Sequence, residues 1–294
     1  MAIESYEQEA LRRSELALRQ KALEPLATSF QPLSFQGDQD FELRNLTSAL
    51  PKHLRQAGPK PNPFLPWDPR LEVCAVGEHH ALILNKYPVQ LGHMLLVTRA
   101  WAPQTDWLQQ QDWNAIGAVD SNTTGLWFFN SGPDAGASQP HRHVQLLPRR
   151  PGDRVCPRSA WFELAIKSDD ANSQRRSGVE QAMRVIKRDT DHPSQPDHLL
   201  TLYRTLSHQL GLGDPCGVGR PSAPYNLLMT RSWMAMVRRR CDGMHGFSVN
   251  ALGFAGYLLA TAQSDLDWLQ TNGPNALLSG VVEPFSENTV AKKS

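Results

Sequence analysis

Four cysteines are few for a chain of 294 residues, and no two of them form a Cys-x-x-Cys pair: Cys74, Cys156, Cys216 and Cys241. This argues against a disulfide framework and against thiol-based zinc sites. Long apolar runs are also missing, because no stretch approaches the roughly 20 apolar residues that cross a bilayer. The first residues are charged and show no secretory signal. We therefore expect a cytoplasmic protein in a reducing setting that does not enter membranes.

An excess of charge of one sign is absent as well. The 30 lysines and arginines nearly balance 29 aspartates and glutamates, so the formal net charge is +1. Such a chain lacks the broad basic field that long nucleic acids attract. Basic residues nevertheless gather locally, and the planar guanidinium group suits phosphate: Arg142, Arg149, Arg150, Arg154 and Arg158. Their grouping favours a small polyanionic ligand and no nucleic acid.

The N-terminal region combines one helical segment with a proline-rich one. A helix is predicted over residues 5–23, where Ser5 and Gln8 have the spacing of a capping box. Residues 24–69 contain many prolines and few periodic segments. Apolar residues near the end of this stretch indicate an arm that packs on the core and is not a disordered linker: Phe64, Leu65 and Trp67.

Regular apolar patterns begin near residue 71 and predict a mixed α and β structure. Strands are predicted over 71–76, 81–84, 94–97, 126–129 and 143–147. A helix is expected around Leu108 to Val119. Residues 151–197 are polar, with a loop over 168–173 and a weakly helical stretch after it. A helix over 199–206 and a hairpin of 225–229 and 233–237 predict a second α+β unit.

The most informative stretch is 136–145, Gly-Ala-Ser-Gln-Pro-His-Arg-His-Val-Gln. Residues two apart on a strand point to the same face, so His141, His143 and Gln145 are expected to line one side. Val144 and Leu146 then pack on the other side. Upstream, residues 130–136 favour tight turns that can aim backbone N–H groups at a phosphate. Two imidazoles and an amide that face one ligand indicate nucleotidyl transfer.

This pattern resembles the histidine-triad superfamily, in the branch where glutamine replaces the third histidine of His-x-His-x-His. Asn-Ser-Gly at 130–132, followed by the 136–145 stretch, is most similar to the diadenosine tetraphosphate phosphorylases, also called ATP adenylyltransferases. Other segments extend the resemblance over most of the chain beyond the N-terminal region: 62–66, 84–89, 93–98, 225–230 and 250–256.

The resemblance implies an α+β fold with a histidine-triad-like antiparallel sheet, helices, and a second α+β half that lacks the histidine motif. Four regions are expected. Residues 1–69 form the N-terminal helix and the arm packed on the core, and 70–150 form the catalytic core. Residues 151–197 connect this core to the C-terminal half, 198–294, which completes the nucleotide pocket.

By resemblance, His143 is the nucleophile. It displaces ATP from diadenosine tetraphosphate, carries AMP briefly and passes it to inorganic phosphate to give ADP. Neutral imidazole suits this role near pH 7 because its ordinary pKa is about 6.5, provided that one ring nitrogen donates to an acceptor and leaves the other free. Gln145 can donate to a phosphoryl oxygen but cannot lose a proton, which favours transfer over hydrolysis. His141 is expected to organise the loop or touch phosphate.

The substrate-binding residues are also expected from the family. The phosphate cradle is Gly136, Ala137, Ser138 and Gln139, and Asn130 binds nearby. Three further residues match positions used for substrate contact, although lysines after strands are often merely solvated: Lys60, Asn85 and Lys86. Thr230, Met234 and Arg238 lie where the C-terminal half returns to the nucleotide, with a core methionine and an exposed arginine as equally good interpretations.

No structural metal is expected, because four histidines lack cysteines or carboxylates at ligand spacing: His79, His80, His192 and His198. A divalent cation, Mg²⁺, is expected to arrive with the polyphosphate, held by substrate oxygens and water.

Two other functions are compatible with parts of the motif. A hexose-1-phosphate uridylyltransferase shares the His-x-His-x-Gln arrangement, but that family usually has proline where this chain has Arg142, and its Cys-x-x-Cys zinc ligands are missing. A non-catalytic nucleotide sensor would keep the pocket without turnover, and the intact His143 and Gln145 argue against it.

Overall fold

An eight-stranded sheet forms the centre of the molecule. The structure is a computed structural model that describes residues 5–31, 33, 40–48, 62–149, 152–167, 178–189 and 191–285. Every neighbouring pair of strands in this sheet is antiparallel. The spatial order is β3 (Glu72–Val76), β4 (His80–Leu84), β5 (Met94–Thr98), β7 (His143–Leu147), β6 (Leu126–Asn130), β9 (Tyr225–Met229), β10 (Trp233–Arg238) and β8 (Met183–Lys187). The expected α+β class with antiparallel sheets is confirmed.

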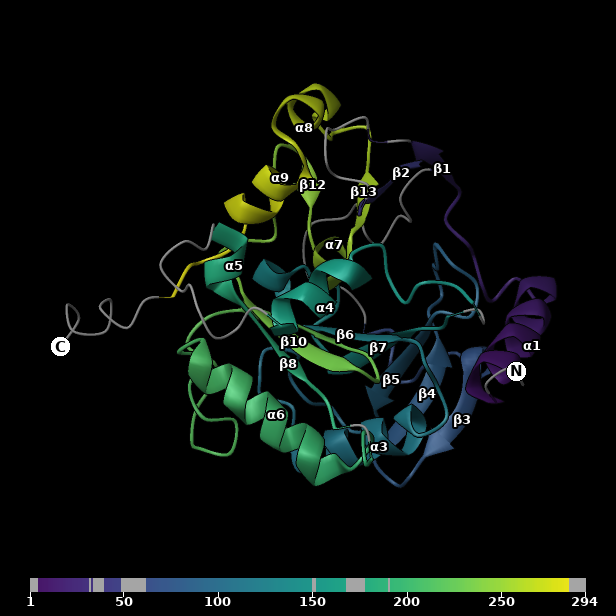
Figure 1. Ribbon diagram of the computed structural model, residues 1–294. Coiled ribbons are helices and arrows are strands. Elements are labelled where there is room, and N and C mark those ends of the chain that lie inside the picture. Colours follow the sequence, from purple (N-terminus) through teal and green to yellow (C-terminus); the bar gives the residue numbers. More distant parts are fainter. Residues whose placement is uncertain are drawn as a thin grey trace.

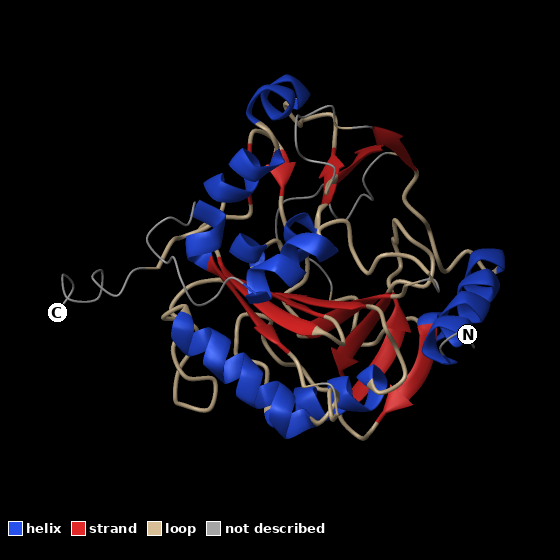
Figure 2. Ribbon diagram, in the orientation of Figure 1, coloured by secondary structure: helices blue, strands red, loops and turns tan. Residues whose placement is uncertain are grey.

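Helices cover both faces of this sheet (Figures 1 and 2). One face, here the α3 face, packs against α1 (Ser5–Arg19), α3 (Gln110–Asp120) and α6 (Pro196–Gln209). The opposite α7 face packs against α4 (Ser159–Lys167), α5 (Gly178–Ala182) and α7 (Ala251–Ala255). With both faces covered, strands need not alternate between apolar and polar residues. All residues of β4, β5, β6 and β9 are accordingly buried.

The strands and helices predicted for the central region are confirmed to within a few residues. β3 to β7, α3, α6 and the β9–β10 hairpin all form where the apolar patterns placed them. Strand β8 was not predicted, although it forms the edge of the main sheet beside β10. It has only five residues, of which Met183 alone is fully buried, so its apolar signal is weak. The predicted loop over 168–173 lies outside the described residues.

The N-terminal region differs from its prediction. Helix α1 ends at Arg19 and not at residue 23. The hydroxyl of Ser5 accepts a hydrogen bond from the Asn122 amide (2.6 Å), and it makes no capping bond to Gln8. Within the arm, β1 (Thr28–Gln31) and β2 (Glu42–Leu46) join β13 (Tyr257–Ala260) in a three-stranded sheet. β1 pairs with β2, and β2 pairs with β13, more than 200 residues further along the chain, so the local sequence did not predict this sheet.

The end of the arm packs on the sheet as predicted. Phe64 is buried against Ala81, Ile83, Leu95 and Val97 on the outer part of the α7 face, and Trp67 packs beside it. Leu65 departs from the expectation, because 40% of its surface is exposed.

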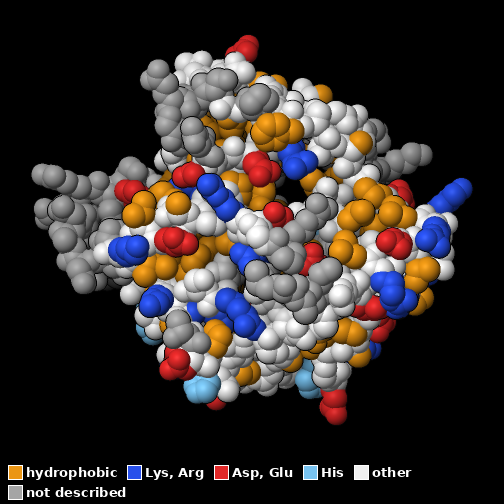
Figure 3. Space-filling model, turned by 45° about the vertical axis from the view of Figure 1, so that its right-hand side comes forward, with side chains coloured by type: hydrophobic (Ala, Val, Ile, Leu, Met, Phe, Trp, Pro, Cys, Tyr) orange, Lys and Arg blue, Asp and Glu red, His pale blue; other side chains and the backbone are white. Residues whose placement is uncertain are grey.

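The remaining elements close the C-terminal side: β11 (Gly243–Met244), β12 (Phe247–Ser248), α8 (Leu266–Asn272) and α9 (Pro274–Gly280). Among the described residues, no helix is both long and apolar enough to span a bilayer. Basic and acidic side chains are interspersed over the face that Figure 3 shows, in keeping with the near-zero net charge.

Candidate active site

The histidine motif lies where β7 begins, at the end of β6 that carries Asn130. His143 and Gln145 point to the α7 face, whereas Val144 and Leu146 pack into the apolar cluster of the α3 face. This confirms the alternation predicted from the motif. His141 precedes the strand and forms an isolated bridge with Pro103.

The imidazole of His143 is held with one ring nitrogen free. Its Nδ1 lies 2.8 Å from the backbone oxygen of His141. A carbonyl oxygen can only accept, so Nδ1 carries the proton and Nε2 presents a lone pair. No described residue makes a hydrogen bond to that Nε2. The acceptor that the sequence left open is therefore the chain's own backbone, two residues earlier.

Both ring nitrogens of His141 are already occupied. Its Nε2 donates to the backbone oxygen of Thr98 (2.9 Å) and lies 2.8 Å from the Thr98 hydroxyl. Its Nδ1 accepts from the amide of Asn62 (2.9 Å), whose oxygen in turn accepts from the backbone of Phe64. A histidine with no free lone pair cannot attack phosphorus, which favours His143 as the nucleophile.

Gln104, a residue that no sequence motif marks, holds β7 at the histidine motif. Its side-chain oxygen accepts from the backbone N–H of His143 (2.8 Å). Its amide donates to the backbone oxygens of Asn130 (2.9 Å) and His143 (3.1 Å). The side chain is buried, so these bonds act in a medium of low dielectric constant. The sequence gives no signal for it, because Gln104 is followed by two other polar residues, Thr105 and Asp106.

A third histidine, His93, lies beside Gln145. It directly precedes β5 and shares the face of Leu95, which pairs with Gln145. The Asn85 amide donates to His93 Nδ1 (3.1 Å), so the proton sits on Nε2. That buried Nε2 makes no hydrogen bond within the described structure. Asn85, expected to contact substrate, thus orients the His93 imidazole beside the Gln145 side chain.

Burial keeps the imidazoles of His143 and His93 neutral. It lowers the pKa of His143 to about 4 and the pKa of His93 to about 4, while the Gln145 side chain acts against the shift at His93. Burial also lowers the pKa of His141. A nucleophile with such a pKa has its lone pair available at every physiological pH.

These shifts predict how stability depends on pH. Between about pH 6.5 and 4 the unfolded chain protonates these histidines while the folded protein keeps them neutral, so the free energy of unfolding should fall as the pH falls through this window. Each buried histidine contributes a slope of up to about 1.4 kcal/mol per pH unit. Urea titrations at pH 7.5 to 4.5 should give His143→Gln a shallower slope than wild type. Equal slopes would mean that His143 titrates normally in the fold.

The glycine-rich loop follows β6 and turns through a 3₁₀ segment, Pro133–Ala135. Gly136 has φ +84°, and an added Cβ would lie 2.8 Å from the Cβ of Asn250. Its N–H and that of Ala137 already donate within the loop, to the backbone oxygens of Pro133 and Gly132. These two amides therefore stabilise the turn itself. Ser138 and Gln139 have N–H groups without a described protein acceptor.

Two buried residues of the C-terminal half support this loop from below. The Asn226 amide donates to Asn130 Oδ1 and to the backbone oxygen of Ala135, both at 2.8 Å. Arg239 donates to Asn226 Oδ1 (2.5 Å) and to the backbone oxygens of Ala135 (3.4 Å) and Val249 (2.8 Å). The side-chain oxygen of Asn130, a residue expected at the substrate, thus accepts hydrogen bonds from within the fold. Only its amide N–H groups remain for a ligand.

The three C-terminal residues expected at the nucleotide lie elsewhere. Strand β9 aligns Asn226 with Asn130, so Thr230 lies past the opposite end of β9, where its hydroxyl accepts from the backbone of the β9–β10 turn. Met234 is fully buried in the cluster of the α3 face. Arg238 points to that same face and pairs with Glu283 (2.9 Å). Strand register, which the sequence does not show, places Thr230 and Met234 at the end of the hairpin away from the loop. Arg238 lies at the loop end, beside Tyr225, but strand alternation turns its side chain to the α3 face.

The arginines near the motif do not form one phosphate-binding cluster. Arg142 is buried on the α3 face, where Nη1 donates to Asp112 (3.0 Å), and Asp112 also accepts from His80 (2.8 Å). Arg158 is buried over the ring of Trp161 and donates to the backbone of α7. The predicted cluster is therefore wrong for these two, because strand alternation separates neighbours.

Of the two lysines expected to contact substrate, Lys86 lies at the surface, where it pairs with Glu24 (3.4 Å) and lies over the ring of Tyr87. Lys60, like Arg150, lies outside the described residues.

Comparison with known families settles what kind of chain this is. Residues 2–157 match the family described as the Ap4A phosphorylase N-terminal domain, and residues 177–284 match the ATP adenylyltransferase C-terminal domain. Ap4A is diadenosine tetraphosphate, and the first match alone covers more than half of the chain. The chain belongs to the Ap4A phosphorylase family. In the terms of this enzyme family, His141, His143 and the loop lie in the N-terminal region, and Asn226 and Arg239 lie in the C-terminal one.

Two curated relatives come from Saccharomyces cerevisiae. Protein APA1 is 27% identical over 234 residues, which is 73% of this chain and 71% of the relative. Diadenosine 5',5'''-P1,P4-tetraphosphate phosphorylase 2 is 25% identical over 236 residues, 73% of this chain and 72% of the relative. The crystal structure of yeast Ap4A phosphorylase Apa2 has the same fold, with a TM-score of 0.73 at 20% identity, and the likeness covers 97% of this chain and all of that one. Apa2 has also been solved with AMP and with Ap4A.

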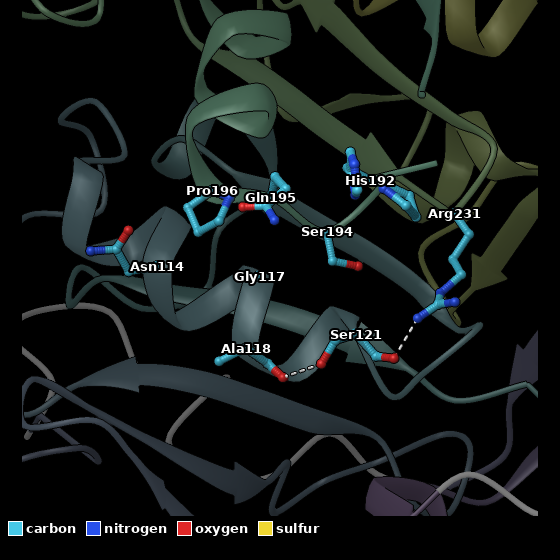
Figure 4. A pocket seen from close by; sticks show the side chains of 10 residues that line it. Asn114, Gly117, Ala118, Ser121, His192, Ser194, Gln195, Pro196 and Arg231 are labelled. Carbon is cyan, nitrogen blue, oxygen red and sulfur yellow. Dashed lines mark hydrogen bonds between the residues drawn. The ribbon is translucent and has the colours of Figure 1, made fainter. Parts of the chain in front are cut away.

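A hollow of about 510 Å³ lies far from this family's histidine motif, between α3 and the segment that precedes α6 (Figure 4). It is on the α3 side of the sheet, whereas His143 faces the α7 side. Arg231 at its rim donates to the backbone oxygens of Asp120 (2.9 Å) and Ser121 (2.5 Å), which satisfies the end of α3. Its polar lining therefore serves the fold.

No protein-built metal site is found among the described residues, since no three His, Cys, Asp or Glu side chains gather there. The donors around His143 are imidazole and amide groups, which do not suit Mg²⁺, a cation that prefers oxygen ligands.

Proposed function

We propose that this chain phosphorolyses diadenosine tetraphosphate to ADP and ATP, and in reverse acts as an ATP adenylyltransferase, through an adenylyl group carried on His143. The observation that carries the proposal is the free Nε2 of His143, opposite an Nδ1–H held by the His141 carbonyl. Membership of the Ap4A phosphorylase family supports the same reaction.

The transfer takes two displacements at phosphorus. The Nε2 lone pair of His143 forms a bond to the α-phosphorus of one adenosine, and the bond from that phosphorus to its bridging oxygen breaks. ATP leaves with the electron pair. An oxygen of inorganic phosphate then attacks the same phosphorus, the P–N bond breaks, ADP forms, and the neutral imidazole is restored.

The other polar groups bind and orient. The Gln145 amide and the His93 Nε2–H face the phosphoryl oxygens, and the N–H groups of Ser138 and Gln139 hold the polyphosphate. The backbone oxygen of His141 accepts a hydrogen bond from His143 Nδ1–H and so fixes the tautomer of His143. Gln145 cannot take a proton from water and so cannot activate it for attack. The adenylyl group therefore stays on His143 until phosphate attacks it.

In this proposal residues 70–150 are a histidine-triad-like catalytic core, 1–69 its N-terminal cover and 151–197 a connecting region. Residues 198–294 lack the histidine motif and complete the nucleotide pocket. Ligands are small nucleotides and phosphate, with Mg²⁺ bound to the polyphosphate of the substrate. A reducing cytoplasmic setting fits four free thiols.

The proposal is tested by product analysis. The protein is incubated with diadenosine tetraphosphate and Mg²⁺, with and without inorganic phosphate, and the nucleotides are separated by anion exchange. ADP and ATP in equal amounts, formed only with phosphate, are expected. AMP and ATP without phosphate would make the chain a hydrolase. If diadenosine tetraphosphate is not turned over but uridine sugars are exchanged, the uridylyltransferase would be favoured. If nucleotides are bound and nothing is turned over, the sensor would be favoured.

A further inference from the structure

Trp101 is an exposed tryptophan beside the catalytic histidines. The chain has eight tryptophans, and the other seven are buried or partly buried. Trp101 keeps 53% of its surface exposed, although indole is among the largest apolar side chains. It lies just after β5, three residues beyond Thr98, which accepts from His141. A large apolar ring left open at this place calls for a ligand.

The ring continues an aromatic row that reaches His143. The centroid of Trp101 lies 5.3 Å from that of His141, edge to face. Phe64 lies 5.6 Å from His141 and 5.3 Å from His143. Residues two apart on an extended chain are about 6.6 Å apart, so the indole is within the length of one nucleotide of the His143 imidazole.

The backbone that carries Trp101 is fixed to the catalytic segment. Arg142 N–H donates to the oxygen of Ala102 (2.8 Å), and Gln104 N–H donates to the oxygen of Pro140 (2.8 Å). The Pro103–His141 bridge lies between them. The indole is therefore exposed but anchored, which lowers the entropy cost of binding a flat ligand.

We propose that Trp101 is the stacking platform for a nucleobase of the substrate. The inference rests on the proposed function and adds to it the surface that holds a base. A base presents a π-face to indole whatever its hydrogen-bonding edge, so this contact supplies affinity with little discrimination between bases.

Stacking predicts a specific pattern in the kinetics of Trp101→Ala. The KM for diadenosine tetraphosphate should rise about 5- to 100-fold, the range found when stacking aromatics are replaced by alanine. The kcat should stay within a factor of a few, because the indole touches the base and not the reacting phosphorus. Trp101→Phe keeps a π-face and should restore most of the affinity. Leu164→Ala, which removes another exposed apolar side chain (64% exposed) on α4, should match wild type.

Inhibitors separate stacking from a general disturbance of the loop. AMP carries a base, whereas inorganic tripolyphosphate does not. In Trp101→Ala the inhibition constant of AMP should rise with the KM, and that of tripolyphosphate should not change. An unchanged KM, or equal weakening of both inhibitors, would overturn the proposal.

Binding of AMP by calorimetry keeps this test separate from the test of phosphorolysis. If wild type binds AMP without turnover, the proposed function fails, and the ratio of AMP affinities between wild type and Trp101→Ala still decides the role of the indole. If wild type phosphorolyses diadenosine tetraphosphate and Trp101→Ala has the same KM, the stacking proposal is wrong and the proposed function stands. The exposed indole then serves another contact.

Discussion

His143→Ala is expected to lose phosphorolysis almost completely, with kcat/KM lower by a factor on the order of 10⁴ or more. Alanine removes the one imidazole of the motif that has a ring nitrogen with a free lone pair, and the backbone oxygen of His141 that oriented it cannot substitute. The measurement is the initial rate of ADP release from diadenosine tetraphosphate at saturating phosphate, between pH 5 and 8. Wild type should lose activity through this residue only toward pH 4, where His143 protonates.

A trapping experiment distinguishes the lost nucleophile from a lost fold. Wild type incubated without inorganic phosphate, with diadenosine tetraphosphate labelled in its α-phosphates, should release ATP and retain label in a bond that acid cleaves, as expected for a phosphoramidate. His143→Ala should retain none while unfolding in urea near the wild-type midpoint. The matched variant is His141→Asn: both ring nitrogens of His141 are already bonded, so this variant should still take up label, at a lower rate. Labelling of His143→Ala would contradict the assignment.

Arg239→Met is expected to be among the most destabilising single substitutions. Arg239 is fully buried, forms no ion pair with a carboxylate of the described residues, and donates to the backbone oxygens of Ala135 in the glycine-rich loop and of Val249 and Val281 in the C-terminal half. Burial lowers the pKa of its guanidinium to about 10, so it stays charged at pH 7. Methionine fills part of the volume but leaves several buried acceptors unpaired, which costs roughly 3 kcal/mol or more. Urea unfolding measures this loss directly.

Arg238→Met is the matched control, one residue away on the opposite face. Its ion pair with Glu283 is partly solvated and should contribute less than about 1 kcal/mol. The KM for diadenosine tetraphosphate should also stay near wild type in this variant, because Arg238 points away from His143. A large increase in that KM would restore Arg238 to the nucleotide site. Arg239→Met with unchanged stability would mean that the loop does not need its buried support.

Local sequence was sufficient for the parts of the site that depend on one short segment. The alternation within β7 places His143 and Gln145 on one face because successive residues of any strand point to opposite sides. The glycines of the segment before β7 likewise predicted a loop, and Gly136 does adopt a positive φ. The same alternation, had it been applied to Arg142, would have placed that side chain on the α3 face and away from any phosphate.

Residues far apart in the chain were beyond such reasoning. Gln104 lies 39 residues from His143, and Asn226 lies 96 residues from Asn130. Their roles depend on which strands are neighbours and in which register, and that choice is made by the burial of all apolar residues together. Thr230 and Met234 were misplaced for the same reason, because a hairpin has two ends and its own sequence does not say which one meets the loop.

The sequence by itself determined the reaction class, the nucleophile expected from the family, and the strands and loop that carry the motif, because these follow from side-chain chemistry and short-range periodicity. Only the tertiary structure decided how the site is held. It supplied the carbonyl that orients His143, the buried His93 beside Gln145, and the support of the loop by Arg239. The first of these contacts joins residues two apart, the second depends on the pairing of β5 with β7, and the third on the pairing of β6 with β9, which joins both halves in one sheet. Such pairings are outcomes of long-range packing that no local pattern specifies.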